Sequence, residues 1–279
     1  MRRRALAVLL PLACTAACTA PAAEVTGPFG ARPTVVLPAE AADPAVRVVL
    51  EGDGPEIGPD DLAVVHYAAY YAAHVRAGGA ARTADSTFAR GAPTAVVPPA
   101  LAAALPGHRV GSRLLVTPPR DRPAAPVYVA DLLGRHAAGA SLDAGGGELH
   151  GVRVSGGARP VLRLPPGPPP GRFAAVVLSR GGGPAASAGR LLVAQYEGVA
   201  WDGGRSVGST WRAGRPAAFT VGDGGVIAGW DHALLGVPAG SRVLMIVPPA
   251  DGYGASGHPP LGVGPGETLV YVMDVLAVY

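Results

Sequence analysis

Lysine is absent from this 279-residue chain, so all 23 of its basic residues are arginine. The absence excludes a phosphate-binding GxxxxGK[ST] loop, which needs its lysine. It also excludes catalysis through a lysine Schiff base or an SxxK nucleophile. Aromatic residues make up only 5% of the chain, whereas glycine (41) and proline (30) are abundant. This composition favours short strands joined by many turns over long helices.

Cysteine is nearly absent as well, and its two occurrences, Cys14 and Cys18, both lie close to the N-terminus. We expect residues 1–23 to be an export signal, because the arginines 2–4 precede the apolar run ALAVLLPLA. That run is too short to remain in a bilayer as a permanent helix. The remainder of the chain has no cysteine, so it must fold without disulfides even in a compartment that allows them.

Small residues surround the second cysteine, and this pattern resembles the cleavage site of a bacterial lipoprotein. The resemblance implies cleavage before Cys18 and lipidation of that residue. The alternative is an ordinary signal peptide cut near Ala17 or Ala23. The protein is therefore expected to be exported, and either held at the cell membrane by a lipid anchor or secreted.

The charge and the histidines exclude several kinds of partner. The formal charge of +3 disappears once the arginines of residues 1–17 are removed, because that segment holds no acid. No basic patch alternates with aromatic residues, so a nucleic-acid partner is not expected. No second apolar run could span a membrane, which leaves a lipid anchor as the expected contact. HExxH and CxxC motifs are absent, so we expect neither a metal nor a cofactor.

The chain repeats itself, which is its strongest organisational signal. ARPTVVLP from residue 31 returns as ARPVLRLP from residue 158, and DSTFARGAP from residue 85 returns as GSTWRAGRP from residue 208. LPGHRVGSRLLVTPP and PVYVADLLG return in the same order as LLGVPAGSRVLMIVPP and LVYVMDVLA. We therefore predict two copies of one domain: copy one, residues 28–136, and copy two, residues 157–279. Between them, residues 137–156 are predicted to be a flexible linker.

Most of each copy is predicted to be strand, because runs such as RVLMIVPP are apolar, β-branched and bounded by glycine or proline. One segment differs: Val226, Ile227, Trp230 and Leu234 recur at helical spacing, and Gly236 follows as a helix stop. Each copy should thus be an α+β unit, an antiparallel sheet whose apolar face is covered by one short helix.

The copies differ where chemistry would be located. Leu101 stands in copy one where copy two has Trp230, and Pro106 replaces Leu235, which should shorten that helix. Copy two has a long loop, Ala250–Thr268, where copy one has only Arg120–Ala125.

Copy two resembles FKBP-type peptidyl-prolyl isomerases through an ordered set of motifs: VAQYEG, STWRAGRPAAFTVG, GVIAGWDHALLGVPAGSR, VPPADGYGASGHP and TLVYVMDVL. The resemblance implies a curled antiparallel sheet wrapped around one short helix, with a pocket between them. The whole chain is then predicted to be two tandem FKBP-like domains, of which copy one is degenerate.

The family's pocket residues can be carried over to the positions that match. The resemblance implies a tryptophan floor, aromatic walls, an apolar rim and polar groups from the long loop. Catalytic roles fall on Tyr196, Phe219, Ile227, Trp230 and Tyr253, and substrate contacts on Val207, Val226, His258 and Tyr271. The Ile227 amide is expected to hydrogen-bond a substrate carbonyl. Val207 replaces the usual pocket phenylalanine and Gly208 the usual aspartate, which copy one keeps as Asp85.

The implied activity has a physical basis. Rotation about an X–Pro amide faces a barrier of ~20 kcal/mol, and its twisted transition state is less polar than the planar ground state. A dry aromatic pocket therefore binds the transition state preferentially, and donors such as the Tyr253 hydroxyl orient the chain. The predicted enzyme is a peptidyl-prolyl cis-trans isomerase that assists the folding of exported proteins. Its partners are proline-containing unfolded or exported polypeptides, and the resemblance adds macrolide-type pocket ligands.

Two alternatives remain open. The pocket of copy two could hold prolyl peptides without turnover, as a binding module or a holdase, and the missing acid at Gly208 favours this. Copy one, without the tryptophan and the long loop, could serve only in packing, in spacing copy two from the membrane, or in gripping unfolded chains.

Overall fold

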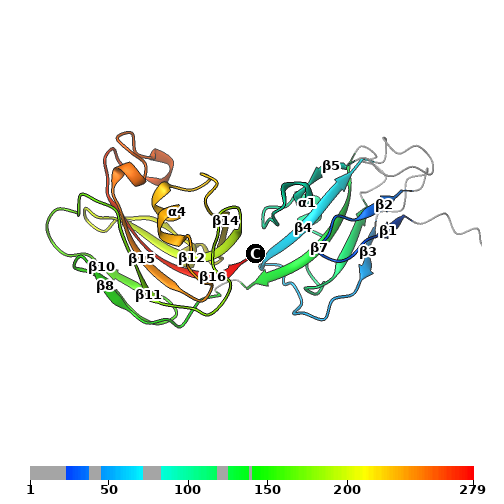
Figure 1. The fold of residues 1–279 in the computed structure, drawn as a ribbon, viewed down its shortest axis with the longest axis horizontal. Coiled ribbons are helices and arrows are strands. Elements are labelled where there is room, and N and C mark those ends of the chain that lie inside the picture. Colours follow the sequence, from blue (N-terminus) through cyan, green and yellow to red (C-terminus); the bar gives the residue numbers. More distant parts are fainter. Residues whose placement is uncertain (1–22, 38–44, 72–82, 118–124, 138–139) are drawn as a thin grey trace, which may run out of the picture.

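The computed structural model describes residues 23–37, 45–71, 83–117, 125–137 and 140–279. It contains two large antiparallel sheets, one in each copy, and they form the two halves in Figure 1. The strand order is β3-β6-β7-β4-β5 in copy one and β11-β15-β16-β12-β13 in copy two, where β14 also pairs with β12. The same order in both sheets agrees with the repeated sequence blocks. The mostly antiparallel architecture with few helices is an α+β fold, as predicted.

The sheet of copy two is covered on both faces. Its strands are β11 (Ala174–Ser179), β12 (Leu191–Ala200), β13 (Ser206–Ser209), β14 (Ala217–Thr220), β15 (Arg242–Val247) and β16 (Leu269–Val278). Along β15, Val243 and Met245 face the core beneath the helix, whereas Leu244 and Ile246 face the opposite side. Strands with both faces buried need continuous apolar runs instead of alternation, which explains RVLMIV.

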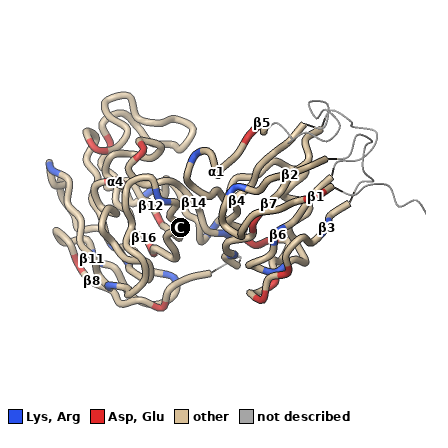
Figure 2. Tube along the Cα trace, turned by 45° about the vertical axis from the view of Figure 1, so that its right-hand side comes forward, with Lys and Arg blue, Asp and Glu red and all other residues tan. Residues whose placement is uncertain are grey.

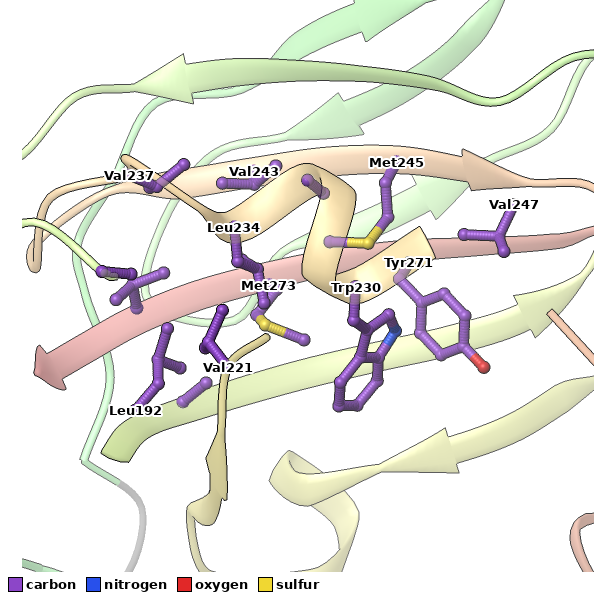
Figure 3. Packing of buried hydrophobic residues seen from close by; sticks show 14 of the residues in the cluster. Leu192, Val221, Trp230, Leu234, Val237, Val243, Met245, Val247, Tyr271 and Met273 are labelled. Atoms are coloured by element: carbon purple, nitrogen blue, oxygen red, sulfur yellow. The ribbon is translucent and has the colours of Figure 1, made fainter. Parts of the chain in front are cut away.

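Helix α4 (Ala228–Leu234) covers the inner face of this sheet. Figure 3 shows Trp230 and Leu234 of this helix among the buried side chains of the strands. Gly229 lets the helix approach β15, because a Cβ at that position would lie 2.7 Å from a methyl group of Val247. Gly236, with φ of 79°, follows the helix end as predicted. Short helices α3 (Thr210–Ala213), η2 (Pro249–Asp251) and η3 (Pro259–Leu261) complete copy two.

Copy one repeats this plan with a smaller helix. Its elements are β3 (Ala45–Leu50), β4 (Leu62–Tyr70), β5 (Thr83–Ser86), β6 (Arg113–Thr117), β7 (Val127–His136), α1 (Thr87–Arg90) and α2 (Pro99–Ala102). Helix α2 has four residues where α4 has seven, in agreement with the predicted shortening. Leu101 is completely buried. Most of the short loop Arg120–Ala125 lies outside the described residues.

The predicted flexible linker is wrong over part of its length. Residues 147–155 form β8 (Gly147–Leu149) and β9 (Val152–Ser155), which pair with β10 (Val161–Arg163). Val152 and Val154 are buried against Leu244 and Ile246 on the outer face of the large sheet. The flanking glycines dominated the sequence pattern, although VRVS alternates as a strand does. The folded unit of copy two thus begins upstream of residue 157.

An equivalent hairpin, β1 (Glu24–Thr26) and β2 (Thr34–Val36), covers copy one. In each copy, a buried arginine–aspartate pair holds its hairpin in place. Arg242 bonds Asp274 at 2.5 Å and donates to the carbonyl oxygens of Ala144 and Gly157 at 2.9 and 2.8 Å. Arg113 bonds Asp131 at 2.6 Å and donates to backbone carbonyls of residues 27, 28 and 31.

Charged residues of both signs are spread over the two halves (Figure 2). No helix among the described residues is long and apolar enough to cross a membrane. Cys14, Cys18 and nearly all of the predicted export signal lie outside the described residues. Ala23, however, is part of the folded structure: it is buried beside Val35 and Leu37, and its carbonyl accepts a hydrogen bond from Arg47.

Candidate active site

A cavity of about 540 Å³ opens where the N-terminal end of α4 meets the long loop of copy two. It brings together five of the residues that the sequence predicted, from two segments of the chain. Its lining consists of Gly224, Gly225, Val226, Ile227, Ala228, Trp230, Gly252, Tyr253 and His258. The segment 224–230 and the loop 252–258 thus face each other across Trp230.

Three aromatic rings hold the indole of Trp230 in place. Its ring centroid lies 4.9 Å from that of Tyr196, 5.0 Å from that of Phe219 and 5.3 Å from that of Tyr271. Tilted and edge-to-face contacts at these distances are favourable for aromatic pairs. Figure 3 shows Tyr271 beside the indole. These three rings pack against the indole and do not themselves line the cavity.

A glycine in the neighbouring strand makes room for Tyr271. A Cβ at Gly198 of β12 would lie 2.3 Å from the ring of Tyr271, so no larger residue fits there. Val207, predicted as a substrate contact, is buried in the core cluster with Trp230 and Tyr271 and does not line the cavity. The substitution of valine at this position therefore places an apolar side chain in the core without adding to the cavity wall.

One side-chain donor at the floor lacks a partner within the described part of the chain. The Nε1 atom of Trp230 is buried without a hydrogen bond to any described residue. Ile227 is the N-cap of α4, with an extended backbone, and its carbonyl accepts from the Trp230 amide at 2.9 Å. A buried donor without a partner costs about 1–3 kcal/mol, and the Nε1 atom of Trp230 is too buried to bind a group in the cavity unless its neighbours move.

The tyrosine hydroxyls stay protonated in this environment. Burial raises the pKa of Tyr253 above its ordinary value of 10.0. Burial also raises the pKa values of Tyr196 and Tyr271, with a further contribution from the nearby Tyr253 hydroxyl. All three therefore remain neutral hydrogen-bond donors throughout the physiological range.

The raised pKa values of these tyrosines predict that copy two loses its folding stability at alkaline pH. In the folded protein, the pKa values of the three tyrosines exceed the unfolded value of 10.0. The contribution of these tyrosines to the free energy of unfolding is therefore complete below pH 10 and is lost as the pH rises through their folded pKa values. Copy two should unfold, by circular dichroism, together with the appearance of tyrosinate absorbance. Tyrosinate absorbance from these residues well before unfolding would contradict the predicted burial effect.

Copy one keeps a polar pair that copy two has lost. The Tyr67 hydroxyl donates to Asp85 at 2.5 Å, and Arg90 donates to the same carboxylate at 2.6 Å. The repeat aligns these three residues with Tyr196, Gly208 and Ala213. A Cβ at Gly208 would lie 3.3 Å from the Tyr196 hydroxyl oxygen. Copy two has thus lost both the acid and the arginine that neutralises it.

Several supporting residues were not identified from the sequence. Asp231 accepts from the Gly222 amide at 2.7 Å, which ties the loop before the cavity to α4. His232 lies 3.3 Å from Asp251, a contact between the helix and the start of the long loop. Gly229, inside the quoted GVIAGW block, could have been noticed as a glycine in a helix interior, where only close packing justifies it.

Comparisons with known proteins place these features in a family. Residues 183–276 match the family described as FKBP-type peptidyl-prolyl cis-trans isomerase. An FK506-binding protein of Streptomyces anulatus is 38% identical over 120 residues, which are 43% of this chain and 97% of that protein. FK506-binding protein 1 of Candida albicans is 33% identical, and the match covers 33% of this chain and 82% of that protein. The crystal structure of AtFKBP13 is 28% identical, covering 38% of this chain and 93% of that one, with a TM-score of 0.35.

The Streptomyces anulatus protein is thus matched over nearly its whole length at 38% identity. The chain therefore belongs to the FKBP-type peptidyl-prolyl cis-trans isomerase family.

Proposed function

We propose that copy two catalyses cis-trans isomerisation of X–Pro bonds in exported polypeptides, without metal or cofactor. The cavity over Trp230 carries this proposal, because it combines an apolar floor with two polar side chains, Tyr253 and His258, in its lining. A proline ring on the indole would place the preceding carbonyl within reach of the rim. The aromatic surroundings favour the twisted, less polar amide over the planar one.

Each residue has a distinct role in this mechanism. Trp230 supplies the floor, while Tyr196, Phe219 and Tyr271 keep it rigid. The Ile227 amide binds a carbonyl of the substrate, and the Tyr253 hydroxyl orients the chain from the opposite side. His258, whose ring centroid lies 5.0 Å from that of Tyr253, supports that side of the cavity.

A refolding assay tests the activity directly. The full chain, at micromolar concentration, should accelerate the refolding of a client protein limited by proline isomerisation, a step that takes tens to hundreds of seconds unaided. The same preparation should accelerate isomerisation of a short prolyl tetrapeptide. A rate equal to the spontaneous one in both assays would reject catalysis and leave peptide binding as the function.

The non-catalytic alternative is favoured by one observation, the loss of the acid at Gly208. Copy one shows which residues restore it. Gly208→Asp combined with Ala213→Arg should raise kcat/KM for a prolyl tetrapeptide by about tenfold, because a neutralised carboxylate would polarise the Tyr196 hydroxyl. Gly208→Asp alone should give a smaller gain, since it leaves the new charge unpaired. The matched control is Gly208→Ala, which introduces the Cβ without the acid; an equal gain there would attribute the effect to packing.

We also propose that the protein is exported and anchored through a lipid on Cys18. Support comes from Ala23, whose side chain and carbonyl are used by the fold, so cleavage after Ala23 would remove a buried residue. Cleavage before Cys18 keeps it and leaves only residues 19–22 between the lipid and Ala23. Labelling with a palmitate analogue should be lost in Cys18→Ala and kept in Cys14→Ala; the reverse result would assign the other cysteine.

A further inference from the structure

The two copies contact each other through equivalent faces. A shared apolar cluster contains Leu62, Val64 and Leu133 of copy one and Leu191, Val193 and Leu276 of copy two. The repeat aligns these residues pairwise: Leu62 with Leu191, Val64 with Val193, and Leu133 with Leu276. Each copy therefore contacts the other through the same patch of its surface, as the two subunits do in the isologous interface of a two-fold dimer.

The last residue of the chain fixes this contact. Figure 1 shows the C-terminus between the two halves. The Tyr279 hydroxyl lies 3.0 Å from Nε2 of His136, the residue that the repeat aligns with it. A Cβ at Gly134 would lie 1.9 Å from the Tyr279 hydroxyl oxygen. Gly134 therefore forms a notch that receives the end of the Tyr279 side chain, and a larger residue at this position would force that ring to move.

A groove of about 480 Å³ runs along this interface beside the candidate active site. Residues from both copies form it. They are Arg90, Ala92, Pro93, Thr94, Ala95 and Val96 of copy one, and Gly189, Leu191, Ala218, Phe219, Thr220 and Asp223 of copy two. Phe219 packs on Trp230, and Asp223 precedes the glycines that line the cavity. The groove thus adjoins the cavity at the segment 219–225.

The wall that copy one contributes is unusually apolar and open. Val96 is 81% exposed, the most exposed of the large hydrophobic residues in the described part of the chain. The repeat aligns it with Phe219, which in copy two is partly buried and packs on Trp230. Arg90, at the end of the groove, is already paired with Asp85. The part of this wall that is left exposed is therefore the apolar side chain of Val96.

We propose that this groove binds the segment of the substrate polypeptide next to its bound proline, with an apolar side chain of that segment against Val96. The inference rests on the proposed function of copy two and assigns copy one a part in substrate selection. The occupant is a polypeptide because the groove adjoins a cavity for prolyl residues at the segment 219–225, and an extended chain advances about 3.3 Å per residue. Short substrates that end at the cavity do not reach the groove.

The test compares a long substrate with a short one. Val96→Asp should lower the ratio of kcat/KM for an unfolded, proline-limited client protein to that for a prolyl tetrapeptide by about tenfold. Val46→Asp is the matched control, since Val46 is an exposed valine on β3 of the same copy and lies outside the groove. That variant should keep the ratio. An unchanged ratio in Val96→Asp, or an equal fall in the control, would overturn the proposal.

A second variant tests the proposed groove without changing any residue of its wall. Gly134→Ala closes the notch for Tyr279 and should separate the copies, which small-angle scattering would detect as an increased radius of gyration. The ratio should then fall as in Val96→Asp, although every groove residue is intact. A retained ratio in a chain with separated copies would contradict a groove formed by both copies.

Failure of the proposed function gives a different result. In that case, the unaltered chain would accelerate neither substrate. The groove is then tested by calorimetric titration with a long proline-containing peptide and with the tetrapeptide. Val96→Asp should weaken binding of the long peptide about tenfold relative to the tetrapeptide, which corresponds to about 1.4 kcal/mol; equal weakening of both would reject the groove.

Discussion

Replacing Trp230 with leucine should abolish most prolyl-peptide binding by copy two while leaving it folded. Copy one shows that the fold accepts this change, because Leu101 occupies the aligned position and is fully buried. Leucine, however, has no flat surface for a proline ring and loses three aromatic contacts. A central aromatic anchor contributes 2 kcal/mol or more, so affinity and kcat/KM should fall by about 30-fold. Calorimetry and the tetrapeptide assay measure both.

A second tryptophan provides the control for this experiment. Trp201 is also buried, but it packs on the outer face of the sheet and donates from Nε1 to the Gly167 carbonyl at 2.9 Å. Trp201→Leu should lower the unfolding temperature and leave peptide affinity unchanged. If Trp230→Leu kept its affinity, the pocket would lie elsewhere; if Trp201→Leu lost it equally, the effect would be one of stability.

The features that the sequence predicts well are those repeated within it. The strands recur as apolar runs, and the helix that covers the sheet of copy two appears as a change from strand to helical spacing. The one-turn helices α1 and α3 were not predicted. Comparison of Leu101 with Trp230 indicated that the fold accepts leucine at this position, so the tryptophan was predicted to serve the pocket. The structure places Trp230 at the floor of a cavity. The motifs from Tyr196 to His258 also identified the residues that surround it.

Features that depend on contacts between distant segments were not predicted. Burial of Val152 against Ile246 turns a glycine-flanked segment into a sheet. The notch at Gly134 has meaning only once Tyr279 of the other copy fills it. Val207 was assigned to the cavity from its motif position, yet strand β13 directs it into the core. The local sequence pattern predicts whether a residue lies in a strand or a helix. Tertiary packing decides whether its side chain faces the core or the cavity.

Asp274→Asn should destabilise copy two by about 3–5 kcal/mol, the loss expected when one partner of a buried ion pair is removed. Both side chains of the pair with Arg242 have no solvent exposure. Without the carboxylate, the guanidinium stays buried and charged, and it also holds the carbonyls of Ala144 and Gly157. Denaturant unfolding followed by circular dichroism should show the lower midpoint.

The aligned pair in copy one makes the prediction specific. Asp131→Asn leaves Arg113 in the same position beneath the β1–β2 hairpin, so it should lower the stability of copy one by a comparable amount and leave that of copy two nearly unchanged. Peptide affinity below the unfolding transition should survive in both variants, because neither pair touches the cavity.

Replacing the whole pair by apolar residues separates charge burial from packing. Arg242→Met with Asp274→Leu removes the unpaired charge, and such exchanges are often neutral or stabilising for buried ion pairs. Here the arginine also binds the backbone of the segment 142–157, so the double variant should recover only part of the loss. Full recovery would show that the hairpin is held by its apolar face alone. A double variant no more stable than Asp274→Asn would show that the carbonyl contacts carry most of the effect.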